Sequence, residues 1–92
     1  MNKRKRSVKH IDYVRTKPCM LCGKSETTAH HLLRAEPRGM GLKTGDNWTV
    51  PLCHYHHQGL HLHGGEVEYF ELHGKDYESV KEYARVLWGE SI

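Results

Sequence analysis

Long apolar segments are missing from this sequence, and large apolar side chains are few. Hydrophobic residues make up 37% of the 92 positions and include a single phenylalanine. A transmembrane helix needs about 20 consecutive, mostly apolar residues, and no segment of the chain approaches that. No apolar segment follows the basic start of the chain, so a secretory signal peptide is not predicted. We therefore expect a cytoplasmic protein that has no membrane partner.

Cysteine is also scarce. Three cysteines cannot all pair within one chain, which argues against a disulfide framework. A chain of this length buries only about 60% of its unfolded surface, so its hydrophobic core alone leaves it marginally stable. Histidine, in contrast, is abundant, and seven of the nine histidines fall between positions 30 and 63. Bound metal is the additional stabilising element that this composition favours.

Charge is unevenly distributed along the chain. The first 17 residues carry seven basic residues and one acidic residue, whereas the last 29 carry three basic and seven acidic residues. A basic cluster can pair with phosphates and release their counterions, which attracts nucleic acid regardless of sequence. The same charge pattern is typical of a solvated chain terminus.

Periodicity and turn residues predict a small protein of both helices and strands. Pro51 indicates that the second strand lies at a sheet edge, and the apolar stripe of the last helix is typical of a core face. The expected elements are a short helix over 7–16, a strand over 27–33, a long loop, a second strand over 48–52, and helices over 53–63, over 66–73 and from Asp76 onward.

Paired metal ligands are the most specific motif. Cys19 and Cys22 form a C-x2-C pair, and Cys53 and His56 form a C-x2-H pair, with 30 residues between the two pairs. Thiolates and imidazole in four positions are typical of a closed structural Zn²⁺ site. His54 is an alternative fourth ligand, and three buried cysteines without a metal are the alternative to the site as a whole.

A second group of histidines is compatible with another metal ion. His57 and His61 are four residues apart and so share one face of the expected helix, which His56 does not. The His30 and His31 doublet lies on the first expected strand, where neighbouring side chains point to opposite faces. One of the two could complete the metal site while the other stays free as a general base.

These motifs, in their order and spacing, resemble the HNH endonucleases, also called ββα-metal nucleases, and in particular small zinc-containing phage and prophage members of the recombination-enhancement type. The resemblance covers about residues 19–64. It implies an α+β fold: a small zinc-stabilised ββα-metal domain with flanking helices. We expect one domain, made of a basic arm with a short helix over 1–18, the zinc knuckle and nuclease core over 19–64, and a helical extension over 65–92.

The resemblance also implies roles for individual residues. His30, His57 and His61 match the ligands of one catalytic divalent ion, and His31 matches the general base. Asn47 matches the asparagine that braces the loop and orients the base; the alternative is a loop residue that forms an Asx turn.

Two departures from the family pattern affect the metals. The fourth zinc position, often cysteine in the family, is His56 here, and many members have aspartate where this chain has His30. A histidine-rich site accepts Ni²⁺, Zn²⁺ or Mn²⁺ as well as Mg²⁺. His10, His63 and His73 are expected on the surface or beside the ligands rather than as ligands.

The resemblance implies that the chain is a metal-dependent DNA endonuclease that nicks with low sequence specificity in a bacterial or phage-infected cell. A phage packaging or recombination protein is a further expected partner. The alternatives are a zinc-stabilised module that binds nucleic acid without cutting it, and a histidine cluster that stores or senses metal. The basic residues expected to contact DNA phosphates, each of which is equally compatible with a plain surface charge, are Lys3, Arg4, Lys5, Arg6, Arg34, Arg38 and Lys43.

Overall fold

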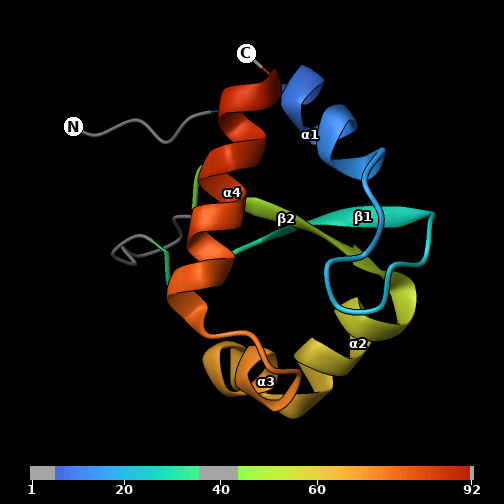
Figure 1. Ribbon diagram of the computed structural model, residues 1–92, viewed down its shortest axis with the longest axis vertical. Coiled ribbons are helices and arrows are strands. Elements are labelled where there is room, and N and C mark those ends of the chain that lie inside the picture. Colours follow the sequence, from blue (N-terminus) through green and yellow to red (C-terminus); the bar gives the residue numbers. More distant parts are fainter. Residues whose placement is uncertain (1–5, 36–43, 92) are drawn as a thin grey trace.

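The computed structural model describes residues 6–35 and 44–91. They form a small α+β structure with four helices and one two-stranded sheet (Figure 1). The elements are α1 (Val8–Arg15), β1 (Thr27–His31), β2 (Thr49–Cys53), α2 (His54–His63), α3 (Glu66–Leu72) and α4 (Tyr77–Ser91). Their order and type confirm the α+β prediction, and their bounds differ from the predicted ones by no more than two residues at either end.

The two strands are antiparallel and place the histidine doublet at a defined register. Thr27 pairs with Cys53 at one end of the ladder, and His31 pairs with Thr49 at the other. Pro51 lacks an N–H, yet its carbonyl accepts a hydrogen bond from the Met20 N–H at 3.0 Å. Within the described residues β2 has β1 as its one strand neighbour, so the predicted edge position of Pro51 is confirmed.

Capping residues set the limits of the helices. The Ser7 hydroxyl accepts the His10 N–H at the start of α1, which satisfies one of the backbone donors that a helix leaves unpaired. Gly64 ends α2 with φ of 89°, a left-handed conformation that glycine adopts without steric penalty. At the start of α4, the Asp76 carbonyl accepts the Val80 N–H.

The core lies between the sheet and the two C-terminal helices. An isolated pair of strands is only marginally stable, so its apolar face needs a cover. Figure 1 shows α4 running beside the sheet, with α1 near the C-terminal end of α4 and α3 near its N-terminal end. α2 packs against α3 and against both strands. The predicted apolar stripe of α4 is confirmed as a core face, because Val80, Ala84 and Leu87 are buried. The buried residues that form one continuous cluster are Cys19, Leu32, Val50, Leu52, Cys53, Leu60, Tyr69, Phe70, Val80 and Ala84.

The predicted domain segments share this core. Phe70 and Val80, from the segment 65–92, pack in the same cluster as Leu32 and Val50, from the segment 19–64. Within residues 6–35 and 44–91, no helix is long and apolar enough to cross a membrane.

His10 is an exception to the expected histidine placement. It was expected on the surface or beside a metal ligand, but its side chain is fully buried between α1 and α4, edge-on to the Trp88 ring at 4.8 Å. Its Nδ1 contacts the Ser91 hydroxyl, and its Nε2 has no partner among the described residues. The surface prediction is wrong because α4 folds back over the face of α1 that carries His10, which local periodicity does not reveal. His63 and His73 are exposed, as predicted.

His10 should give the protein a specific sensitivity to acid. Burial lowers the pKa of His10, and the opposing effect of the Asp46 charge is smaller. The unfolded chain therefore takes up this proton first as the pH falls below about 6.5, and the free energy of unfolding decreases until the lowered pKa is reached. Urea titrations at about pH 7.5 and pH 5.5 should show a smaller acid loss for His10→Gln than for wild type. The exposed His63→Gln is the control, and equal losses in wild type and His10→Gln would refute the assignment.

Candidate metal centres

The first candidate centre joins a tight turn to the junction of β2 and α2. The turn after α1 presents Cys19 and Cys22, and it is closed by hydrogen bonds from the Gly23 N–H to the Cys19 carbonyl and from the Cys19 N–H to the Lys24 carbonyl, both 2.8 Å. Gly23 has φ of 79°, which allows the chain to reverse there. Cys53 is the last residue of β2, and His56 lies in the first turn of α2.

The spacing of the four ligand atoms fits a tetrahedral zinc ion. Zn–S bonds of about 2.3 Å and Zn–N bonds of about 2.0 Å place two sulfurs about 3.8 Å apart and a sulfur and a nitrogen about 3.5 Å apart. The Sγ atoms of Cys22 and Cys53 are 3.6 Å apart. The Nδ1 atom of His56 lies 3.3 Å from the Cys53 Sγ and 3.7 Å from the Cys19 Sγ. These four residues could hold a structural metal ion, with His56 rather than the exposed His54 in the fourth position.

Local electrostatics favour the ligand forms of Cys19 and His56. Burial acts to raise the pKa of the Cys19 thiol, but the backbone N–H groups of Cys53, Leu21 and Cys22 more than offset this effect and hold the pKa below its ordinary value. Burial, together with the charges of His73 and Lys24, lowers the pKa of His56. Thiolate and neutral imidazole are the forms that bind zinc.

The second candidate centre consists of three histidines. His30 on β1 and His57 and His61 on α2 bring their ligand atoms within 4.8 Å of one another. The Nε2 atoms of His57 and His61 are 3.3 Å apart, which is the separation of about 3.3 Å expected for two nitrogens on a tetrahedral ion. The predicted grouping is thus present, and it joins the buried His30 to the more exposed face of α2.

Thr28 helps to present His57. The Thr28 hydroxyl donates to the Leu52 carbonyl at 3.3 Å, so its oxygen accepts the His57 Nδ1–H at 3.2 Å. The lone pair of His57 then lies on Nε2, the atom nearest to His61. Burial and the charges of His30, His61 and His54 lower the pKa of His57, which keeps this imidazole neutral, as metal binding requires.

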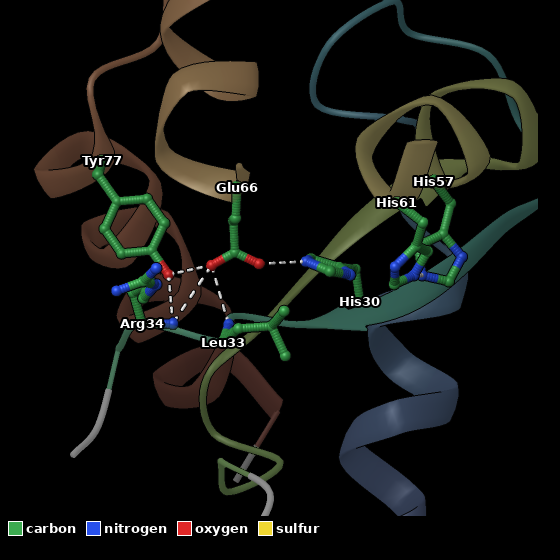
Figure 2. Close-up of polar contacts among 7 residues, drawn as sticks. All are labelled: His30, Leu33, Arg34, His57, His61, Glu66 and Tyr77. Carbon is green, nitrogen blue, oxygen red and sulfur yellow. Dashed lines mark hydrogen bonds and ion pairs between the residues drawn. The ribbon is translucent and has the colours of Figure 1, made fainter. Parts of the chain in front are cut away.

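A buried carboxylate lies behind His30. Figure 2 shows Glu66, at the start of α3, on the side of His30 away from His57 and His61. Its Oε1 accepts the His30 Nε2–H at 2.7 Å, and its Oε2 accepts the Leu33 N–H at 2.8 Å and the Tyr77 hydroxyl. Burial acts to raise the pKa of Glu66, but the hydrogen bonds from His30, Tyr77 and Leu33 hold it below its ordinary value. Burial also raises the pKa of Tyr77, and Glu66 adds to that shift.

His31 faces a different partner. Its Nε2 donates to the Asp46 Oδ1 at 2.8 Å. The Ser7 N–H donates to the Asp46 Oδ2 at 2.8 Å, and the Arg6 guanidinium lies 3.8 Å from the Oδ1. Burial acts to raise the pKa of Asp46, but the hydrogen bonds from His31 and Ser7, together with the charges of His31 and Arg6, hold it below its ordinary value. The carboxylate therefore stays ionised and fixes the His31 ring.

Sequence reasoning missed both carboxylates. Asp46, and not the adjacent Asn47, contacts the His31 ring, while Asn47 is half-buried in the turn before β2. The position of Asp46 beside Asn47 was a usable signal. Nothing in the sequence distinguishes Glu66 from the other acidic residues of the C-terminal segment, because its burial depends on how α3 and α4 pack.

The predicted phosphate contacts are only partly covered by the structure. Arg6 is exposed and donates to the Thr44 carbonyl at 2.9 Å. Arg34 is also exposed, and its backbone N–H donates to the Tyr77 hydroxyl at 3.1 Å. The predicted contacts that lie outside the described residues are Lys3, Arg4, Lys5, Arg38 and Lys43.

These features define a small α+β protein with a cysteine and histidine cluster that could hold a metal ion. The chain belongs to the DUF968 family, described as a protein of unknown function, which matches residues 1–86. It is 36% identical over 80 residues to the uncharacterized protein YdfU of Escherichia coli (strain K12). That match covers 85% of this chain but 22% of YdfU, so the chain spans about a fifth of that relative's length. No solved structure matches the chain.

Proposed function

We propose that this chain is an HNH-type, metal-dependent DNA endonuclease that hydrolyses phosphodiester bonds. One observation supports this most strongly. Two antiparallel strands followed directly by a helix bring His30, His57 and His61 together, while the neighbouring His31 is outside that group and is held by a carboxylate. A structural zinc site or a binding module has no need of an oriented, unliganded imidazole beside a second metal group. The ββα-metal fold is part of this proposal.

His31 is the proposed general base. Asp46 is ionised and can only accept hydrogen bonds, so the proton on the His31 ring lies on Nε2 and the lone pair lies on Nδ1. Nδ1 takes the proton from a water molecule as the water oxygen forms its bond to phosphorus. The bond from phosphorus to the leaving 3′ oxygen then breaks. The products are a 5′ phosphate and a 3′ hydroxyl, as the resemblance implies.

His30, His57 and His61 are the proposed ligands of the catalytic divalent ion. Their neutral nitrogens suit Mn²⁺, Ni²⁺ or Zn²⁺, and Mg²⁺ is a further candidate. When bound, such an ion stabilises negative charge on the scissile phosphate and on the leaving oxygen. Among the described residues, β1 pairs only with β2, so its other edge carries no strand. That edge lies between the face that carries His30 and the face that carries His31. We place the scissile phosphate at that edge.

DNA is the proposed partner, bound mainly through its backbone. Arg6 and Arg34 are exposed and belong to the basic residues predicted to contact phosphates. Contacts with phosphates position a protein without reading the bases, so cleavage should have little sequence preference. A phage packaging or recombination protein as a second partner, and a location in the cytoplasm, stay predictions.

Plasmid cleavage tests the proposal. Purified zinc-loaded protein should convert supercoiled plasmid to the nicked form when Mg²⁺, Mn²⁺ or Ni²⁺ is added, and a chelator should stop the reaction. Single-stranded and branched DNA should be tested in parallel, because the proposal does not specify which form of DNA is cut. If the folded protein binds these DNAs in gel shifts but never cuts them with any of the metals, the nuclease proposal fails. A non-catalytic, zinc-stabilised nucleic-acid-binding module then replaces it.

A further inference from the structure

Among the residues that the structure describes, Glu66 is the most deeply buried carboxylate that the proposed reaction does not use. Its side chain is 2% exposed, and it lies against the His30 side chain, which is 3% exposed. A buried charge is costly unless it is paired and fully hydrogen-bonded. Glu66 meets that condition through donors from three separate parts of the fold, namely β1, the turn that follows β1, and α4.

Both carboxylate oxygens of Glu66 are occupied. Oε1 accepts from the His30 Nε2–H at 2.7 Å. Oε2 accepts from the Leu33 N–H at 2.8 Å, from the Arg34 N–H at 3.4 Å and from the Tyr77 hydroxyl. The carboxylate is therefore held from the side opposite His30 and cannot rotate without breaking several hydrogen bonds. It lies behind the histidine cluster (Figure 2) and is placed to orient a ligand rather than to be one.

This arrangement fixes the tautomer of His30. An ionised carboxylate has no proton to donate, so the proton between Glu66 and His30 lies on the imidazole Nε2. The lone pair of the neutral ring is then on Nδ1, and only the nitrogen with the lone pair can bind a metal ion. The ring centroid of His30 lies 5.1 Å from that of His57 and 5.9 Å from that of His61.

We propose that Glu66 is a positioning residue for His30, and that Tyr77 braces it, so that carboxylate, imidazole and catalytic ion form one unit. The inference rests on the proposed function, because it assigns the His30, His57 and His61 cluster to a divalent ion. A hydrogen bond that a ligating histidine donates to a carboxylate orients the ring and makes it a stronger ligand, and loss of such a bond weakens metal binding by about 10- to 100-fold.

Glu66→Gln is the sharpest variant. A glutamine amide has one acceptor oxygen, and the backbone N–H groups and the Tyr77 hydroxyl on the far side require that oxygen. The amide NH₂ would then face His30 Nε2 and move the imidazole proton to Nδ1, the atom that should bind the ion. We expect Co²⁺ and Ni²⁺ to bind zinc-loaded Glu66→Gln about 10- to 100-fold more weakly than wild type in calorimetry, and the visible spectrum of bound Co²⁺ to change.

Two controls separate positioning from a general effect on folding. Glu68→Gln changes an exposed glutamate in the same turn of α3 and should bind both ions as wild type does. Melting temperatures measured with zinc alone report the structural contribution of Glu66. If Glu66→Gln does not fold, the proposal can still be tested by measuring the ¹⁵N chemical shifts of the His30 ring in wild-type protein that carries one equivalent of zinc. They should show the proton on Nε2, and a proton on Nδ1 would overturn the proposal.

The outcomes separate this inference from the proposed function. Wild type that binds Ni²⁺ at the histidine cluster but cuts no DNA would refute the nuclease alone. Glu66→Gln that binds Co²⁺ and Ni²⁺ within about twofold of wild type would refute the role of Glu66 alone. Wild type that takes up no second ion would refute both.

Discussion

Replacing Cys22 with serine is expected to unfold most of the chain. Structural zinc contributes on the order of 10 kcal/mol of apparent folding free energy in small zinc domains. A chain of 92 residues has a net stability of only about 5–14 kcal/mol. Loss of one thiolate ligand therefore removes most or all of that stability. Circular dichroism should show loss of helix, and the purified variant should retain little zinc.

The choice of Cys22 makes this test specific. Cys22 is exposed, so its replacement creates no cavity in the core, unlike replacement of the buried Cys19 or Cys53. His54→Ala is the matched control, because His54 is exposed and lies outside the ligand cluster. It should keep both the zinc and the melting temperature of wild type. A Cys22→Ser protein that has the same melting temperature and the same zinc content as wild type would refute a stabilising metal at this site.

Replacing His31 with alanine is expected to lower the rate of DNA cleavage by about a hundred- to ten-thousand-fold. This is the range that a positioned general base contributes. The fold should survive, because the His31 side chain is 32% exposed and is not part of either ligand cluster. Single-turnover cleavage of plasmid under metal-saturating conditions measures the effect on the chemical step. Zinc content and helical signal should match those of wild type.

The cleavage rates of three further variants show whether the loss in His31→Ala comes from a missing proton acceptor. Imidazole added to His31→Gly should restore part of the rate if the missing group is a proton acceptor. Asp46→Asn should cause a smaller loss, since the ring remains but its hydrogen-bonded orientation is weakened. His63→Ala alters an exposed histidine at the end of α2 and should cut as wild type does. A His31→Ala protein that cuts at the rate of wild type would exclude His31 as the base.

Local pattern was sufficient for the elements and for most of the candidate metal ligands. Cys19 and Cys22 lie in one tight turn, and Cys53 and His56 lie within one helical turn of each other. This short spacing alone brings the two ligand atoms of each pair close together. His57 and His61 share a face of α2 for the same local reason, the helical repeat. Caps and glycines likewise act within a few residues, which is why the order of helices and strands agrees with the sequence prediction.

Tertiary packing decided which partners surround those ligands. Asp46 reaches His31 from 15 residues away, and Glu66 reaches His30 from 36 residues away. Neither pair lies within a single helix or strand, so no periodic signal marks these pairs. His10 is buried for a similar reason, because α4 returns to α1 from the far end of the chain and its Ser91 contacts His10. The choice of His56 over His54 as the fourth member of the cysteine cluster likewise depends on the direction in which α2 leaves β2.

The sequence by itself therefore determined the residues from which the candidate metal ligands come, the helices and strands, and the resemblance to the HNH nucleases. Each of these depends on residues that are near one another in the chain or in regular register. The tertiary structure alone decided which carboxylate holds which histidine, and hence which ring nitrogen of His30 and His31 carries the lone pair. That choice depends on the docking of α1, α3 and α4 against the strands, which is set by burial summed over the whole core rather than by any local motif.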